Sequence, residues 1–111
     1  MIGVLIVTHG RLGEALLESA SMLVGDTDQV RAVGFLPGQG VEDLDTAVRA
    51  ALADLDDGDG ILAMVDIPGG SPARVVGALT VERRDLELVA GANLGMLVET
   101  LMARRDAALP S

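Results

Sequence analysis

Residues 61–66 have the sequence Ile61-Leu62-Ala63-Met64-Val65-Asp66, an apolar run without regular alternation of polar and apolar side chains. A strand of this kind is buried on both faces, which is typical of a parallel sheet with helices packed on each side. A turn-forming segment, residues 56–60, precedes the run, and a loop with two glycines and two prolines, residues 67–72, follows it. The run therefore predicts a central strand of an α/β fold.

The same pattern repeats in both directions along the chain. Short runs rich in valine and isoleucine alternate with longer segments that have the apolar period of a helix. This alternation predicts crossover units and a mainly parallel sheet. We predict one doubly wound α/β domain over residues 1–111, with helices on both faces and the strand order 2-1-3-4. The predicted strands are 2–7, 29–36, 61–66 and 86–90, and the predicted helices are 12–24, 41–55, 73–82 and 94–104.

Composition narrows the classes of function. Of the 111 residues, 17 are acidic and 8 are basic, and the resulting net charge of -9 repels nucleic acid and anionic membrane surfaces. The chain has one Phe and neither Trp nor Tyr, so stacking on bases or sugars is excluded as a main source of affinity. We therefore expect no nucleic-acid partner and favour a protein partner with a basic surface.

The amino-terminal sequence bears on localisation. Residues 1–7 are apolar but lack the basic leader of a signal peptide and the length of a membrane-spanning helix. Cysteine is absent from the chain. We expect a cytoplasmic protein without direct membrane insertion.

Two polar side chains are expected to meet at one edge of this sheet. Open parallel sheets bind ligands beyond the carboxyl ends of their strands, at the point where the strand order reverses. His9, the only histidine, follows the first predicted strand, and Asp66 ends the third. Neighbouring strands lie about 4.8 Å apart, so the two side chains are expected to touch. A carboxylate on one ring nitrogen leaves the other as an unprotonated nucleophile, which suits acceptance of a phosphoryl group.

The loop after Asp66 contains groups that can hold the oxygens of a phosphoryl group. Gly69 and Gly70 allow the backbone to approach closely, and the Ser71 hydroxyl is a hydrogen-bond donor. Ser71 and Pro72 match the N-cap and first position of a helix, whose amino terminus favours negative charge. Such a site needs no metal, nucleotide or other cofactor.

Each of these features also has a plain structural interpretation. A lone histidine after a strand is often an incidental loop residue, and Asp66 can simply hydrogen-bond within the next turn. The segment 69–72 can be an ordinary turn and helix start. The acidic residues between 42 and 59 are typical of a solvated helix face, and a carboxylate metal site there is poorly supported.

Several short segments, taken in their order along the chain, resemble those of the mannose-type enzyme IIA of the bacterial phosphoenolpyruvate-dependent sugar phosphotransferase system. These are Thr8-His9-Gly10, Val65-Asp66, Gly69-Gly70-Ser71-Pro72, and Gly91-Ala92-Asn93 followed by residues 96–104. The resemblance implies that His9 accepts a phosphoryl group on Nε2 from the histidine-containing phosphocarrier protein and passes it to an enzyme IIB during sugar uptake. It also implies that Asp66 orients the imidazole and that Thr8, Gly69, Gly70 and Ser71 face the phosphate.

The chain also departs from the pattern of that family. Ala73 and Arg74 stand where larger or amide-bearing residues are typical, and Leu94-Gly95 replaces a common proline-containing pair. Both departures bear on the choice of partner. Family members commonly continue into a segment that adds a strand across a dimer, whereas this sequence ends at Ser111. We expect a homodimer, a separate IIB recipient, and at most association with membrane permease components.

Three other functions stay open from the sequence. The chain can donate its phosphoryl group to a dihydroxyacetone kinase instead of an enzyme IIB. It can be a regulatory binding module whose phosphorylation state is read by a target protein. A receiver-like module with Asp66 as acceptor fits less well, because no basic residue flanks the strand ends and no second carboxylate joins Asp66 to bind magnesium.

Overall fold

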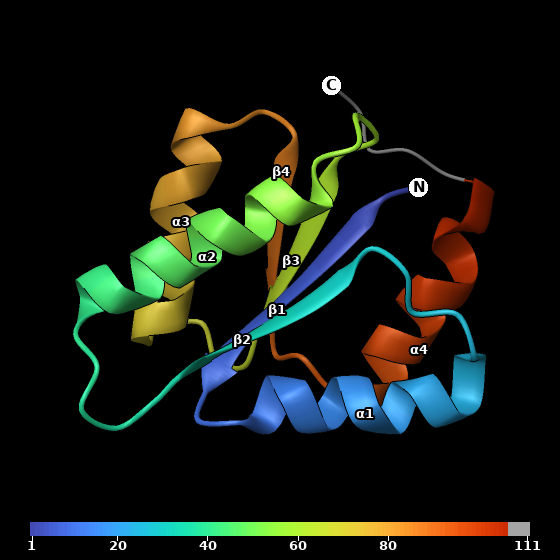
Figure 1. Ribbon diagram of the computed structural model, residues 1–111, viewed down its shortest axis with the longest axis horizontal. Coiled ribbons are helices and arrows are strands. Elements are labelled where there is room, and N and C mark those ends of the chain that lie inside the picture. Colours follow the sequence, from blue (N-terminus) through green and yellow to red (C-terminus); the bar gives the residue numbers. More distant parts are fainter. Residues whose placement is uncertain (107–111) are drawn as a thin grey trace.

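A single parallel sheet forms the centre of the computed structural model, which describes residues 1–106 (Figure 1). Its strands are β1 (Gly3–His9), β2 (Val30–Phe35), β3 (Ile61–Val65) and β4 (Leu86–Ala90). They lie in the order β2-β1-β3-β4, and every neighbouring pair is parallel. The predicted order is therefore confirmed. Residues 107–111, the end of the predicted domain, lie outside the described part of the chain.

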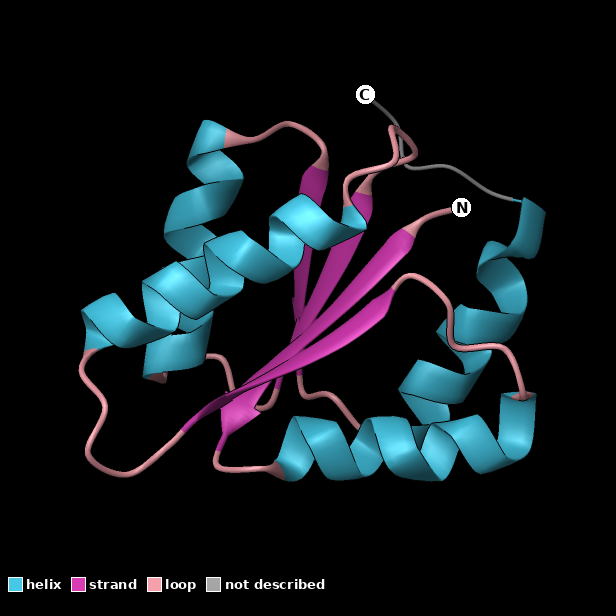
Figure 2. Cartoon of the chain, viewed as in Figure 1, coloured by secondary structure: helices cyan, strands magenta, loops and turns pink. Residues whose placement is uncertain are grey.

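Helices cover both faces of the sheet, as Figure 2 shows. On one face α1 (Leu12–Val24) packs against α4 (Leu94–Ala103), and on the other α2 (Val41–Leu55) packs against α3 (Ser71–Glu82). A short 3₁₀ helix, η1 (Arg104–Asp106), follows α4. Among residues 1–106, no helix combines the length and apolar character needed to cross a bilayer.

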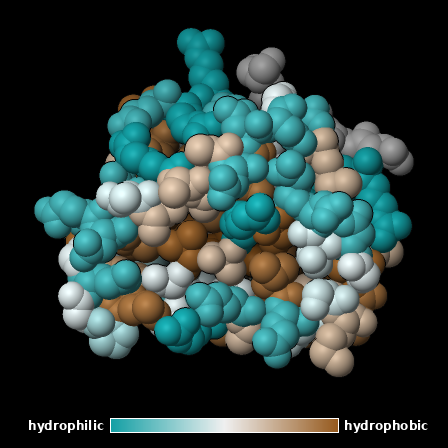
Figure 3. Space-filling model, in the orientation of Figure 1, coloured by the Kyte–Doolittle hydropathy of each residue, from teal (hydrophilic) through white to brown (hydrophobic). Residues whose placement is uncertain are grey.

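Strand β1 supplies side chains to both hydrophobic cores. Leu5 and Val7 belong to the core under α2 and α3, whereas Val4 and Ile6 belong to the core under α1 and α4. All four are buried, as expected for a central strand without polar alternation. The edge strand β2 is only half-buried over most of its length, and Figure 3 shows apolar surface between α1 and α2, where Figure 1 places β2.

The carboxyl end of β1 extends two residues beyond the predicted strand. Thr8 pairs with Gly34, and His9 pairs with Phe35. Gly34 permits this close pairing, because a Cβ atom at that position would lie 2.2 Å from the carbonyl oxygen of Gly10. On the other side of β1, Val7 pairs with Val65, the last residue of β3. His9 and Asp66 therefore leave neighbouring strands at the point where the strand order reverses.

Helix α3 begins earlier than predicted, and Ser71 is not its N-cap. The N-cap is Gly70, which has extended backbone angles (φ -91°, ψ 179°), and no side chain caps the helix. The Gly70 carbonyl oxygen accepts a hydrogen bond from the Arg74 amide at 3.1 Å. Ser71 is thus the first helical residue and Pro72 the second. The prediction failed by one residue because glycine at an N-cap has no side chain that reveals its role.

Candidate functional site

His9 and Asp66 are in direct contact at the carboxyl edge of the sheet. The His9 Nδ1 atom lies 2.9 Å from Asp66 Oδ2, and the His9 backbone amide donates to the same oxygen at 3.0 Å. The Ile67 amide donates to Asp66 Oδ1 at 3.1 Å. The carboxylate is 12% exposed and the imidazole is 46% exposed. Asp66 is thus a fixed acceptor beneath a histidine that faces solvent.

The charge of Asp66 selects the tautomer of the neutral imidazole. Partial burial acts to raise the Asp66 pKa, but hydrogen bonds from the backbone and imidazole of His9 outweigh it and hold the pKa below its ordinary value. An ionised carboxylate only accepts hydrogen bonds, so the proton of a neutral imidazole resides on Nδ1. In that tautomer Nε2 carries the free lone pair.

Gly70 lies directly against the Cε1–Nε2 edge of the imidazole. A Cβ atom at this position would lie 2.5 Å from His9 Cε1 and 3.0 Å from His9 Nε2. At Gly69, by contrast, an added Cβ would meet nothing within 4 Å. Glycine is therefore required at residue 70 if the ring is to keep its contact with Asp66, and residue 69 is under no such restriction.

The first turn of α3 begins beside this edge of the imidazole, since Gly70 is its N-cap. The backbone N–H groups of Ser71 and Ala73 have no carbonyl partner within the helix, since the first N–H groups of any helix lack one. The helix dipole adds partial positive charge at this end. An anion bonded to His9 Nε2 would therefore meet donors and a favourable potential at Gly70 and Ser71.

Two apolar side chains flank the imidazole, and the sequence reasoning missed both. The Phe35 ring lies edge-on to the His9 ring, with centroids 6.3 Å apart and planes at 64°. Ile67 is 50% exposed, and its Cδ1 atom borders the same Gly70 position. Phe35 is the only phenylalanine and lies one residue before the end of the predicted edge strand 29–36, which is the signal that would have identified it.

The Thr8 side chain does not join this group. Thr8 is fully buried, and its Oγ1 accepts a hydrogen bond from the Gly13 amide at 2.8 Å. It therefore ties the end of β1 to the first turn of α1. Its hydroxyl is turned away from solvent, so the side chain is not placed to face a phosphate as the resemblance implied.

Ser71 and Arg74 complete the polar surroundings. The Arg74 guanidinium lies 3.4 Å from Ser71 Oγ and donates to it. In the described part of the chain, no group of three or more acidic or histidine side chains is arranged to hold a metal ion. Beyond the Asp66 carboxylate, the polar groups at the start of α3 are backbone amides, a hydroxyl and a guanidinium, which suit an anion.

This geometry defines an α/β protein with a histidine–carboxylate pair at the switch point of an open parallel sheet. The family described as the fructose IIA component of the phosphotransferase system (PTS) matches residues 3–111. The chain therefore belongs to this family of enzyme IIA components of the sugar phosphotransferase system, the mannose, fructose and sorbose type.

Individual relatives agree with this assignment. The chain is 44% identical over 105 residues to the mannose-specific EIIAB component of Escherichia coli, covering 95% of this chain and 32% of that protein. It is 36% identical to the fructose-specific EIIA component of Bacillus subtilis, and the match covers 98% of this chain and 75% of that protein. The crystal structure of an EIIA component from Streptococcus agalactiae superposes with a TM-score of 0.86 at 31% identity, covering 96% and 81%. The chain spans about a third of the Escherichia coli protein.

Proposed function

We propose that His9 is a phosphoryl carrier, which accepts the group on Nε2 from the histidine-containing phosphocarrier protein and donates it to an enzyme IIB. One observation supports this proposal above all. The Nδ1 atom of the half-exposed imidazole lies 2.9 Å from an ionised Asp66, so that in the neutral ring Nε2, beside Gly70, is the nitrogen with the free lone pair. A nucleophile with these properties accepts a phosphoryl group without a separate base.

The transfer needs no proton movement at His9. The Nε2 lone pair forms a bond to phosphorus while the bond between phosphorus and the donor nitrogen breaks, and that electron pair returns to the donor. The His9 ring then carries a positive charge, with its proton still on Nδ1. Asp66 stabilises that charge, while the donors at the start of α3 stabilise the phosphoryl oxygens.

The surroundings of His9 fit a protein partner. Ile67 and Phe35 form an apolar border on which a second protein can exclude water from the reacting atoms. The net charge of -9 favours a basic partner surface and speeds its encounter. Both features fit a phosphocarrier protein as the donor.

Reconstitution of the transfer chain tests this function. The chain is incubated with phosphoenolpyruvate, enzyme I and the phosphocarrier protein, and its intact mass is measured before and after an enzyme IIB is added. We expect one acid-labile phosphoryl group, which moves to the IIB. Reactions that lack the phosphocarrier protein give the background. A chain that gains no mass while its donors are active would overturn the proposal. If the phosphoryl group moves to a dihydroxyacetone kinase and not to an enzyme IIB, the kinase is the recipient and His9 is still the carrier.

Gly70→Ala is expected to slow phosphorylation of His9 by about 10–100-fold, because an added Cβ displaces the ring from its bond with Asp66. Gly69→Ala is the matched control, since an added Cβ there meets nothing. Initial phosphorylation rates by intact-mass kinetics measure the difference. Equal rates in the two variants would show that the approach of residue 70 to the ring has no importance for the reaction.

Asp66→Asn is expected to slow phosphoryl acceptance by about 100-fold, in line with the loss of other carboxylates that orient a histidine. Asparagine keeps the size of the side chain but removes the charge that stabilises the phosphorylated ring. The rate is measured with the same donors. A rate unchanged from the wild type would assign Asp66 a purely structural part at the end of β3.

A further inference from the structure

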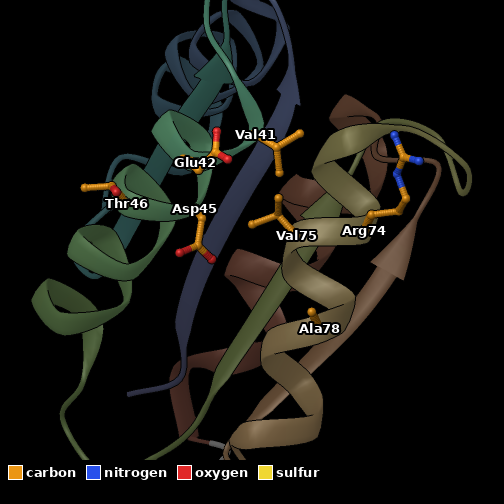
Figure 4. A pocket seen from close by; sticks show the side chains of 7 residues that line it. All are labelled: Val41, Glu42, Asp45, Thr46, Arg74, Val75 and Ala78. Carbon is orange, nitrogen blue, oxygen red and sulfur yellow. The ribbon is translucent and has the colours of Figure 1, made fainter.

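Arg74 places a positive charge beside the loop that faces His9. Its guanidinium donates to Ser71 Oγ at 3.4 Å. Figure 4 shows the side chain directed toward the amino-terminal end of α3, away from Asp45 on α2. The two helices form the walls of a groove, which is lined by Val41, Glu42, Asp45, Thr46, Arg74, Val75 and Ala78.

The charge of Arg74 is not used in any ion pair within residues 1–106. Within residues 1–106, four of the eight arginines have carboxylate partners: Arg11 pairs with Glu14, Arg31 with Asp54, Arg49 with Asp45 and Glu82, and Arg83 with Asp85. In this range Arg74 shares its lack of an ion pair with Arg84, Arg104 and Arg105, but of these four it alone lies in the first turn of α3. Asp45, on the opposite wall of the groove, is thus already engaged by Arg49 at 3.0 Å. Within residues 1–106, the Arg74 guanidinium makes one side-chain hydrogen bond, the long one to the Ser71 hydroxyl.

The first turn of α3 joins Arg74 to the residue that borders the reactive nitrogen. The Arg74 amide bonds the Gly70 carbonyl at 3.1 Å, and the Cβ position of Gly70 lies 3.0 Å from His9 Nε2. A phosphoryl group on Nε2 would project into the opening beside Gly70 and Ser71, with up to two negative charges on three oxygens. Exchanging a long bond to a neutral hydroxyl for a bond to a charged oxygen is favourable.

We propose that Arg74 binds the phosphoryl group on His9 and holds it on this chain. This inference rests on the proposed function of His9. Arg74 forms no covalent bond in the step: the Nε2–phosphorus bond forms and breaks as described above, and the guanidinium donates hydrogen bonds to a phosphoryl oxygen while the group is present. Its effect is to stabilise the phosphorylated form and to shift the transfer equilibrium toward this chain.

Four proteins test the inference: the wild type, Arg74→Ala, Arg74→Lys and Arg84→Ala. Arg84 is the matched control, because it is exposed, has no ion pair within residues 1–106 and lies beyond the other end of α3. His9 is phosphorylated chemically with potassium phosphoramidate, so that no protein partner enters the first readout. This first readout is the pKa of the phosphoryl group on His9, measured by a pH titration that is monitored by ³¹P NMR. The second is the ratio of phosphorylated chain to phosphorylated phosphocarrier protein at equilibrium.

We expect Arg74→Ala to raise the pKa of the phosphoryl group and to lower the equilibrium ratio about five-fold, as for one partly exposed charge-assisted hydrogen bond. Arg74→Lys should restore part of both effects, and Arg84→Ala should match the wild type. If Arg74→Ala matches Arg84→Ala in both readouts while the wild type carries phosphate on His9, Arg74 has no such role and the proposed function stands. If Arg74→Ala leaves both readouts unchanged and alters only the KM for a protein partner, Arg74 is a docking residue and the inference is wrong. A wild type that takes up no phosphate on His9 under either donor overturns the proposed function itself.

Discussion

His9→Ala is expected to take up no phosphoryl group from phosphoenolpyruvate, enzyme I and the phosphocarrier protein, a complete loss rather than a slower rate. His9 is the only histidine in the chain, so no second imidazole can replace it. Intact-mass measurement after incubation, with acid treatment of a duplicate sample, gives the result directly.

The same substitution should leave the fold intact. The His9 side chain is half-exposed and lies outside both hydrophobic cores. Asp66 keeps the backbone amides of residues 9 and 67 as hydrogen-bond donors when the imidazole is removed. We expect the free energy of unfolding to change by no more than about 1 kcal/mol. A His9→Ala protein that still gains a phosphoryl group would place the acceptor at another residue. If the His9→Ala protein does not fold, His9→Gln takes its place in the experiment.

Arg104→Met is expected to lower the free energy of unfolding by about 3 kcal/mol, the largest stability effect that we predict. Arg104 is 3% exposed, and its guanidinium donates to the carbonyl oxygens of Ile2, Gln29 and Asp28 at 2.9, 3.1 and 2.5 Å. These bonds tie η1 to the start of β1 and to the segment before β2. Burial lowers the pKa of the guanidinium but leaves it charged, since an arginine does not deprotonate in proteins.

Urea unfolding followed by circular dichroism measures this loss, and Arg105→Met is its control. Arg105 is exposed, and in the part of the chain that the structure describes its guanidinium has one hydrogen bond, to the Met102 sulfur at 3.7 Å. We expect the control to change the free energy of unfolding by less than about 0.5 kcal/mol. Equal stability of the two variants would mean that the three carbonyl groups are satisfied as well by water as by Arg104.

The sequence predicted the sheet because its signals are local and strong. The unbroken apolar runs of β1 and β3 require burial on both faces of the sheet. Strands of this kind lie at the centre of a sheet, so few strand orders are possible. Helices α1 and α2 begin and end where their apolar period predicts. Two boundaries at the site differ from the prediction, and a glycine is responsible for each. Gly34 lets β1 continue to His9, and Gly70 caps α3 in place of Ser71.

The candidate site was predictable only in part. The topology alone brings His9 beside Asp66, because their strands are neighbours. The approach of Gly70 to the imidazole, the Phe35 ring beside it and the Arg74 guanidinium at Ser71 depend on backbone paths and side-chain rotamers that no local pattern encodes. The burial of Thr8 likewise follows from its register in β1. Arg104 appears in the sequence as one of two adjacent arginines, and nothing local distinguishes the buried one.

The central claim is that Asp66 occupies Nδ1 of His9 and leaves Nε2 as the phosphoryl acceptor. The direct test is NMR of the protein labelled with ¹⁵N in the imidazole of its single histidine, phosphorylated by the phosphocarrier protein. A one-bond ¹⁵N–³¹P coupling identifies the bonded nitrogen. We predict that the coupling appears at Nε2, with the proton retained on Nδ1. A coupling at Nδ1, or a phosphorylated protein with no coupling to either ring nitrogen, would contradict the account.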